Sequence, residues 1–418
     1  MKIAFLAYSA LPHIGGAQIF AFNTMNSLVE RGHQVHFYLP YKSYKKFINA
    51  NLNYNFQVRP ILICEYFLAN NVPILIQLYL FIQQLLHRYD LWQVIGAYPA
   101  GYVAKHLSKI VPVILRCHGD DIQKEASINY GLRLNPKLEK KIATTVKKMT
   151  KLVALTPTVT DCYIELGATR ENIIEIPNGI DLSTFRAFDK QKIKKLLRSK
   201  LKIKDNQTLL LTVGRYHIKK GYELIPQIAS ALSQRNIEFK WLVVGEKCHH
   251  IEPLIQNTHV GNSILLLDPT KNEISKLLAN FDLTDMKTAK PDTASNGIKI
   301  KFSAPSHDLI LTYLAHDIFV MPSLLETFGM VLIEAMAAEL PVISTDAPGC
   351  RDIVIHEHNG LVSKVGDIEK MAHNIEQIIK NENLNNKIRN TIKSEIINYD
   401  WSNIAEKYES LYKTTLLV

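Results

Sequence analysis

The chain has 418 residues, of which 47% are hydrophobic and 21% are charged. This composition is typical of a folded globular protein and excludes collagen-like and disordered classes. The length exceeds what one hydrophobic core normally supports, so two domains are expected. The five cysteines have no paired spacing, which indicates reduced thiols in a cytoplasmic protein rather than a disulfide framework.

The net charge of +10 is unevenly distributed. Residues 1–190 hold 21 Lys and Arg against 13 Asp and Glu, a balance of +8. A basic first half suits an anionic partner, such as a phosphorylated acceptor or the surface of an acidic membrane. The alternative is a moderately basic surface that serves only solubility. The most apolar run, VPILIQLYLFIQQLL, is too short to span a bilayer and is expected to form a buried core helix.

Strands and helices alternate along the first half, the pattern of a parallel α/β domain. The loop SALPHIGG leads into a helix with Phe22, Met25 and Val29 on one face. PNGID at 177–181 is a strong loop signal. Strands are expected at 3–8, 34–38, 91–95, 113–116, 151–155 and 173–176.

A second α/β unit begins with the strands TLLLTVG and FKWLVVG. The final helix places Trp401, Ile404, Tyr408 and Leu411 on one stripe. The fold class is therefore α/β, with two Rossmann-like doubly wound domains facing a central cleft. The expected organisation is a domain at 1–190, a basic solvated linker at 191–204, a domain at 205–398 with a long loop inserted at 282–297, and a helix at 399–418 that crosses back to the first domain.

The segment SLLETFGMVLIEAM, residues 323–336, predicts a ligand site in the second domain. Its helix should start near Gly329, so the backbone N–H groups of Phe328, Gly329, Met330 and Val331 would point at an anion such as phosphate. Glu326 and Glu334 would lie roughly 12 Å apart if all of the segment is helical. A diphosphate flanked by two hydroxyl-bearing groups fits this spacing, and a nucleoside diphosphate sugar has that form. For Glu334, an ion pair with a distant Lys or Arg is the alternative.

Three further features fall in loops at the carboxyl ends of predicted strands. Arg215 and Lys220, in VGRYHIKKG, could neutralise a diphosphate, although either alone is more often a surface charge. His118 follows the strand at 113–116, where a structural role is the alternative. The pair Gly15–Gly16 permits close approach of a ligand to the backbone but is a weak motif.

Two other chemistries are disfavoured. The segment CHHIEPLIQNTH lacks paired ligands at zinc spacing. A nicotinamide dehydrogenase is disfavoured because the first loop lacks G-x-G-x-x-G and the second strand ends without an acidic residue for a ribose.

These segments resemble the family-four retaining glycosyltransferases, which have the GT-B architecture. The resemblance spans nearly the whole chain and rests most on the E-x7-E signature of Glu326 and Glu334. The matching segments, in the family's order, are GGAQ, HGDD, PNGID, VGRYHIKKG and PSLLETFGMVLIEAMAAELPVIST.

The resemblance implies a catalytic group of His118, Glu326, Arg215 and Lys220. Glu326 would hold the donor sugar, Glu334 the ribose, and His118 would lie beside the transferred sugar. The second domain would bind the nucleotide sugar and the first the acceptor. Donor binding would involve Gly15, Gly16, Arg215, Lys220, Glu326, Phe328, Gly329, Met330, Val331 and Glu334. No cofactor and no metal are expected, and no D-x-D triplet is present.

The implied reaction moves a sugar from a nucleoside diphosphate sugar to a glycan or lipid-linked acceptor, in cell-surface polysaccharide or lipopolysaccharide synthesis. The enzyme would be cytoplasmic, with peripheral contact to an anionic membrane and no nucleic-acid partner. A nucleotide-sugar epimerase and a non-catalytic sugar-nucleotide-binding protein are the alternatives. Three departures from the family stand out: Glu339 replaces a frequent glycine, VVGEKC lacks a second glycine, and 282–297 is long.

Overall fold

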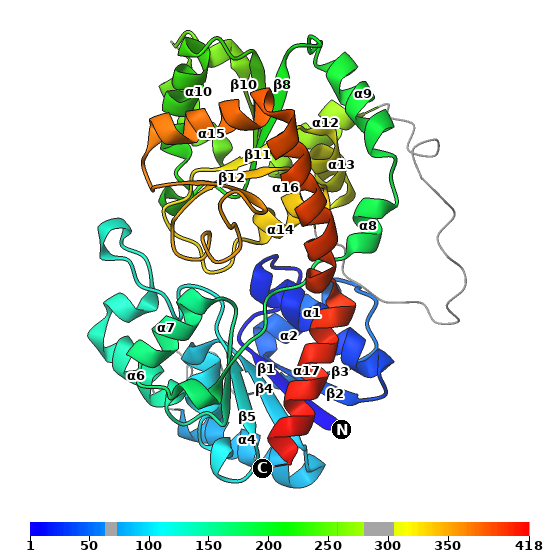
Figure 1. The fold of residues 1–418 in the computed structure, drawn as a ribbon. Helices are drawn as coiled ribbons and strands as arrows, with labels where there is room; N and C mark the ends of the chain where they lie inside the picture. The colour runs from blue at the N-terminus through cyan, green and yellow to red at the C-terminus, as the bar shows by residue number, and fades with distance from the viewer. Residues whose placement is uncertain (63–72, 257, 280–304, 418) are drawn as a thin grey trace. The chain divides into compact units, whose positions relative to one another are not determined.

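The computed structural model describes residues 1–62, 73–256, 258–279 and 305–417. The chain forms two compact units (Figure 1). Unit 1 contains residues 1–179 together with 400–417, and unit 2 is built from the chain between residues 180 and 399. The insertion expected at 282–297 lies outside the described residues.

Unit 1 is built on a seven-stranded parallel sheet in the order β3-β2-β1-β4-β5-β6-β7. Phe5 of β1 lies in register between Phe37 and Gln93 on the neighbouring strands, and its side chain is fully buried. The six strands predicted for this half are all present, and β3 is the additional one. The strands are β1 Lys2–Ala7, β2 Gln34–Pro40, β3 Gln57–Ile61, β4 Leu91–Ile95, β5 Val113–Arg116, β6 Lys151–Ala154 and β7 Ile173–Glu175.

The C-terminal helix α17 (Trp401–Leu416) packs on unit 1 beside α1 (Figure 1). A Cβ on Gly179 would come 2.5 Å from the Trp401 ring, so this contact requires glycine. The Tyr412 hydroxyl lies 3.0 Å from Oε1 of the buried Gln93. The other main helices of unit 1 are α1 Gly16–Glu30, α2 Tyr41–Asn49, α4 Ile74–His87, α5 Tyr102–Ala104, α6 Pro136–Val146 and α7 Pro157–Glu165.

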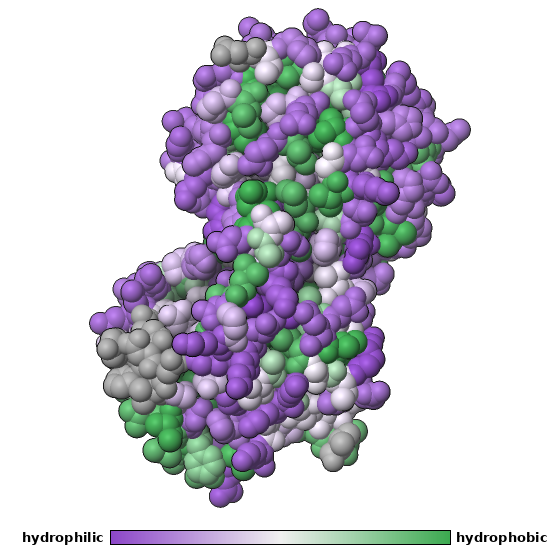
Figure 2. Space-filling view, turned by 90° about the vertical axis from the view of Figure 1, so that its left-hand side faces the viewer, coloured by the Kyte–Doolittle hydropathy of each residue, from purple (hydrophilic) through white to green (hydrophobic). Residues whose placement is uncertain are grey.

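Helix α4 corrects one prediction, because it is not a buried core helix. Only Ile76 and Leu80 are buried, and Leu86 is 69% exposed. The helix is apolar on all sides, but only one of its faces packs on unit 1. Hydrophobic surface gathers at the lower left of Figure 2, at the end of unit 1 that carries α4 in Figure 1. Its exposed apolar residues are Ile74, Leu75, Leu78, Phe81, Ile82, Leu85 and Leu86.

Unit 2 is built on a six-stranded parallel sheet in the order β10-β9-β8-β11-β12-β13. The strands are β8 Thr208–Val213, β9 Phe239–Val244, β10 Ile264–Leu267, β11 Ile318–Met321, β12 Val342–Thr345 and β13 Gly360–Ser363. The helices are α8 Leu182–Arg186, α9 Lys190–Lys200, α10 Ile225–Gln234, α11 Glu252–Ile255, α12 Glu273–Leu278, α13 His307–Ala315, α14 Met330–Ala337, α15 Ile368–Lys380 and α16 Glu382–Glu395.

The segment expected to be a solvated linker, 191–204, forms most of α9 and packs against α13 within unit 2. Ile193 and Leu197 are fully buried, and the Asp189 carboxylate caps the helix N-terminus. The unit boundary accordingly lies near residue 180, earlier than the 190 expected from sequence. A small apolar stripe is enough to bury this helix, while Lys192, Lys195 and Lys200 stay exposed.

Candidate active site

In unit 2, two loops meet at the switch point of the sheet. Strands β8 and β11 are neighbours, and the chain runs outward from them in opposite directions. Ligands of such sheets bind at the carboxyl ends of the strands on either side of this point. A Cβ on Gly221 would come 2.0 Å from the Pro322 carbonyl oxygen, and the Leu324 N–H donates to the Lys219 carbonyl at 2.7 Å. These contacts hold the loop after β8 against the loop after β11.

The locked loops bring Lys220 and Glu326 together as an ion pair. Their side chains are 15% and 7% exposed. Burial raises the pKa of the Glu326 carboxyl, but the charges of Lys220 and Lys219 outweigh burial and hold this pKa below its usual value. The site therefore contains an ionised carboxylate beside an ammonium group. The prediction from sequence placed both residues in the site but did not anticipate their direct contact.

A third loop, after β12, holds the backbone of Glu326. The Glu326 N–H donates to the Pro348 carbonyl at 2.9 Å. Gly349 has a φ of +80°, and a Cβ there would come 2.2 Å from the Glu326 carbonyl oxygen. Only glycine fits this approach. This contribution of Gly349 is not predicted from the sequence, although the Pro-Gly pair after a predicted strand is a turn signal.

Glu334 accepts a 2.7 Å hydrogen bond from the hydroxyl of Tyr313, which is fully buried on α13. Burial raises the pKa of Glu334 to about 7, against smaller opposing effects of Tyr313 and Lys220. Within the described residues, no ion pair joins Glu334 to a Lys or Arg, and the ligand role of Glu334 stays a prediction. The carboxyl is held by one hydroxyl and can accept others from a ligand.

Helix α14 begins at Met330, after Gly329 with a φ of +77°. The first N–H groups of an α-helix have no intrahelical acceptor, so those around Met330 and Val331 are available to an anion. Glu326 lies outside the helix, so the 12 Å estimate that assumed a continuous helix does not hold. Glu334 lies within the helix and is buried.

Arg215 is exposed on the loop after β8. With Lys219, it contributes to lowering the pKa of His217, for which burial is the largest cause. The positive charge of this loop is therefore concentrated near the Lys220–Glu326 pair. Among the described residues, Arg215 forms no ion pair, unlike Lys220.

His118 belongs to unit 1, and its imidazole is neutral. Burial, and then the charge of Arg116, lower its pKa well below the usual value. Arg116 Nε donates to His118 Nε2 at 3.2 Å, which leaves the proton on Nδ1. Arg116 is itself fully buried, and Asn178 Oδ1 accepts from its Nη2 at 2.6 Å. His118 can therefore donate a hydrogen bond from Nδ1, but it is not a cationic acid at neutral pH.

Asp121 organises the loop that carries His118. Its Oδ1 accepts from the N–H groups of His118 and Gly119 at 3.1 and 3.2 Å, and its Oδ2 accepts from the Ala97 N–H at 2.8 Å. Gly15, by contrast, is the N-cap of α1 with an extended φ of −165°, and its nearest obstacle to a Cβ is the flexible Gln18 side chain. The structure does not itself require glycine at this position, and the ligand role of Gly15–Gly16 stays a prediction.

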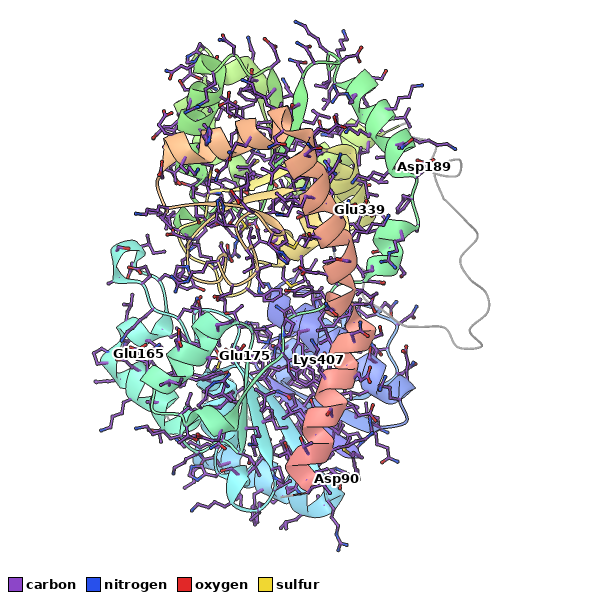
Figure 3. The ribbon with its side chains drawn as sticks, viewed as in Figure 1. Asp90, Glu165, Glu175, Asp189, Glu339 and Lys407 are labelled. Atoms are coloured by element: carbon purple, nitrogen blue, oxygen red, sulfur yellow. The ribbon has the colours of Figure 1, made fainter. Side chains whose placement is uncertain are left out.

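Two departures from the family coincide with left-handed backbone. Lys247, where a second glycine is frequent, has a φ of +62°, and Glu339, just after α14, has a φ of +56°. Glu339 is labelled in Figure 3. Lys190 Nζ donates to the Ala338 carbonyl and Arg389 to the Glu339 carbonyl, so two cations satisfy the C-terminus of α14. This capping compensates for the missing glycine.

Replacing Glu339 with glycine is expected to stabilise the protein by roughly 0.5–1 kcal/mol, because it relieves the left-handed strain at that residue. The partly offsetting cost is the larger backbone entropy of glycine in the unfolded chain. Urea denaturation measures the change. Lys387→Gly, on the exposed face of α16, is the matched control and should destabilise by a similar amount. A loss of stability in Glu339→Gly would contradict the strain argument.

No cluster of three potential metal ligands is found in the part of the chain that the structure describes. His249, from the segment considered for zinc, lies 3.0 Å from Glu273 and 3.7 Å from Glu252. No helix of the described residues is long and apolar enough to cross a membrane.

Two parallel α/β units, one with two glutamates and a basic loop at its switch point, agree with the GT-B architecture. Family models agree: residues 14–184 match the model described as Glycosyltransferase Family 4, and residues 287–395 match the model described as Glycosyl transferases group 1. The chain belongs to this family of glycosyltransferases.

Its relatives are distant. The chain is 22% identical to N-acetyl-alpha-D-glucosaminyl L-malate synthase of Bacillus anthracis, over all of this chain and 97% of that protein. It is 27% identical to the capsular polysaccharide biosynthesis glycosyltransferase CapM of Staphylococcus aureus, over 64% of this chain and 62% of that protein. Among solved structures, HepE of Anabaena in complex with UDP aligns with a TM-score of 0.73 and 18% identity, over 99% of this chain and all of that one.

Proposed function

We propose that the protein transfers a sugar, with retention of configuration, from a nucleoside diphosphate sugar to a hydroxyl of a glycan or lipid-linked acceptor. The observation that carries this proposal is the Lys220–Glu326 pair beside the N-terminus of α14. An ammonium group and free N–H groups suit a diphosphate, while an ionised carboxylate suits sugar hydroxyls. The UDP complex of a structural relative supports this class of donor.

In the proposed reaction, the bond between the anomeric carbon and the diphosphate breaks as the acceptor oxygen attacks from the same face. Lys220, Arg215 and the N-terminus of α14 stabilise the negative charge that develops on the departing diphosphate. The diphosphate takes the acceptor's proton, so no protein side chain acts as the general base. Glu326 holds the donor sugar and Glu334 the ribose. His118 donates from Nδ1 to the transferred sugar.

We propose that the reaction needs no metal ion or cofactor. Positive charge for the diphosphate comes instead from Lys220 and from Arg215, which is exposed and forms no ion pair among the described residues. The conventional role of a divalent cation in such a site is to neutralise the leaving diphosphate, and these two side chains with a helix N-terminus serve the same purpose.

The proposed biological setting is cell-surface polysaccharide or lipopolysaccharide synthesis on the cytoplasmic side of a membrane. The similarity to CapM, a capsular polysaccharide biosynthesis glycosyltransferase, supports a role in polysaccharide synthesis. The exposed apolar residues of α4 and the basic balance of residues 1–190 support peripheral contact with an anionic membrane, since apolar side chains and lysines together favour such surfaces.

A donor screen tests the proposal. Thermal shift and hydrolysis are measured with UDP-, GDP- and ADP-sugars for the wild type, for Glu326→Ala, and for Glu238→Ala, which removes an exposed carboxylate of unit 2. One nucleotide sugar should stabilise the wild type and be hydrolysed slowly. Hydrolysis should fall by roughly 100-fold or more in Glu326→Ala and stay unchanged in Glu238→Ala.

The alternatives give different results in the same screen. A nucleotide-sugar epimerase would convert the donor without releasing the nucleotide. A non-catalytic binding protein would be stabilised by a nucleotide sugar that it never consumes. The transferase proposal fails if no nucleotide sugar stabilises the protein and the substitutions Glu334→Ala and Arg215→Ala change neither the thermal shift nor the hydrolysis.

A further inference from the structure

A pocket of about 530 Å³ lies in unit 1 between the segment after β4 and helix α6. This volume is in the range of small-molecule sites. The rings of Tyr98 and Tyr102, whose centroids are 6.1 Å apart, form its aromatic wall. Of the lining residues that the structure describes, none is acidic and four are lysines: Lys105, Lys137, Lys140 and Lys141.

Lys105 is the unusual member of this group, because a lysine is rarely buried without an anionic partner. It is only 5% exposed, and its ammonium group lies 3.3 Å from the centre of the Tyr102 ring. The ammonium group of Lys141 lies 5.4 Å from the rings of both tyrosines. Burial, followed by the charges of Lys148 and Lys141, lowers the pKa of Lys105 to about 8. No carboxylate pairs with Lys105 among the described residues.

The acidic side chains near this end of α6 are used elsewhere. Glu139 of α6 pairs with Lys124 at 2.7 Å and with Arg133 at 3.2 Å. Glu165, labelled in Figure 3, lies 3.2 Å from Lys124 and 2.9 Å from Arg133. These two glutamates therefore pair with Lys124 and Arg133 and not with Lys105.

The pocket adjoins the loop of His118. Strands β4 and β5 are parallel neighbours, so the segments that follow them lie at the same edge of the sheet. Asp121 joins these segments, since one oxygen accepts from the His118 N–H and the other from the N–H of Ala97, the residue before Tyr98. A ligand in the pocket would therefore lie at the same edge of the sheet as His118, the residue assigned to the transferred sugar.

We propose that this pocket binds a phosphate group of the acceptor, with Lys105 as its central cation. A phosphate dianion matches several converging ammonium groups better than a single carboxylate does, and lysine is a common phosphate ligand. Tyr98 and Tyr102 cover the carbon atoms next to the phosphate. The identification of the ligand as the acceptor rests on the proposed function. The affinity of the pocket for phosphate does not depend on that function.

Calorimetric titration of the full chain with inorganic phosphate and with a hexose phosphate tests the pocket directly. Lys105→Met keeps the buried stem and removes the charge; Kd for both ligands should rise at least tenfold. Lys109→Met, four residues further on and exposed, is the matched control and should leave Kd unchanged. Lys105→Arg should retain part of the affinity. If Lys105→Met binds phosphate as the wild type does, or if affinity is lost only in Lys220→Met/Glu326→Gln, the pocket is not the phosphate site.

The source of the phosphate is distinguished with vesicles. Hexose phosphate binding without binding to phosphatidic acid vesicles supports a soluble phosphorylated acceptor. Binding to phosphatidic acid but not phosphatidylcholine vesicles, lost in Lys105→Met, supports a lipid-borne phosphate. A third outcome is vesicle binding that Lys105→Met retains and Leu78→Ser loses, in a protein without affinity for hexose phosphate. This outcome would indicate adsorption through α4 and would overturn the proposal that the pocket binds phosphate. Donor turnover is measured separately, so a protein that hydrolyses donor but binds no phosphate loses only this inference.

Discussion

Replacing Lys220 with methionine is expected to cost about 3 kcal/mol of unfolding free energy and to reduce transfer by roughly 100-fold or more. The stability loss arises because Glu326 would remain buried without its cation, and a stranded buried charge is strongly destabilising. The loss of activity arises because the ammonium group would no longer stabilise the departing diphosphate. Urea denaturation and initial rates measure the two effects, and Lys387→Met, on the surface of α16, is the control.

The double variant Lys220→Met/Glu326→Gln separates these effects. It removes both charges, so much of the stability should return while activity stays lost. In Lys220→Met alone, burial should raise the pKa of Glu326, so stability should fall as pH rises from 5 to 8. In the wild type that pKa is held low, and the corresponding stability is lost only as pH falls below about 4.5. Equal stability of the single and double variants would contradict a buried ion pair.

Replacing Glu334 with glutamine is expected to stabilise the protein at pH 8 but not at pH 5. The folded pKa of about 7 lies above the unfolded value of 4.5, so the folded state retains a proton that the unfolded state has lost. Stability of the wild type therefore falls as pH rises between these values, by roughly 3 kcal/mol once Glu334 is fully ionised. Glutamine never ionises and can still accept from Tyr313.

The same substitution should weaken donor binding by roughly tenfold, because an amide accepts ribose hydroxyls less strongly than a carboxylate does. Urea denaturation at pH 5 and pH 8 is compared for the wild type, Glu334→Gln and Glu238→Gln, whose side chain is exposed. The Glu238 variant should follow the wild type at both pH values. A wild type and a Glu334→Gln variant with the same pH dependence would show that Glu334 is not a buried titrating group.

The sequence predicts the strands of unit 1 well, because most are apolar runs bounded by loop signals. β3 is the exception: its residues QVRPI include Arg59 and Pro60 and lack an apolar alternation, as an edge strand permits. For α4 and α9, composition misleads in opposite directions. Helix α4 is apolar on all sides, so its sequence does not reveal which face meets a partner. The apolar stripe of α9, with Ile193 and Leu197, is small, so the many lysines of this helix suggest a solvated segment although the stripe is buried.

For the candidate site, the sequence predicts the residues but not what holds them. Tyr313 lies 21 positions before Glu334, on the apolar helix α13. In such a helix a tyrosine is expected to be an ordinary core residue. The contact of Gly349 with Glu326 depends on how the loop after β12 folds back, which has no local signal beyond the Pro-Gly pair. Both are long-range contacts, and spacing along the chain does not encode them.

The division of the chain also sets an order of events during synthesis. Unit 1 is interrupted by the whole of unit 2, and its core includes Trp401, Tyr408 and Tyr412. The hydroxyl of Tyr408 is uncharged, and it accepts a hydrogen bond from the buried guanidinium of Arg116. On the ribosome, the part of unit 1 that emerges first therefore waits with an exposed groove until the last helix is made, and Arg116 then has His118, Asn178 and the Ile176 carbonyl as partners but not Tyr408. All described residues of unit 2 precede Asp400, so this unit can fold in the meantime.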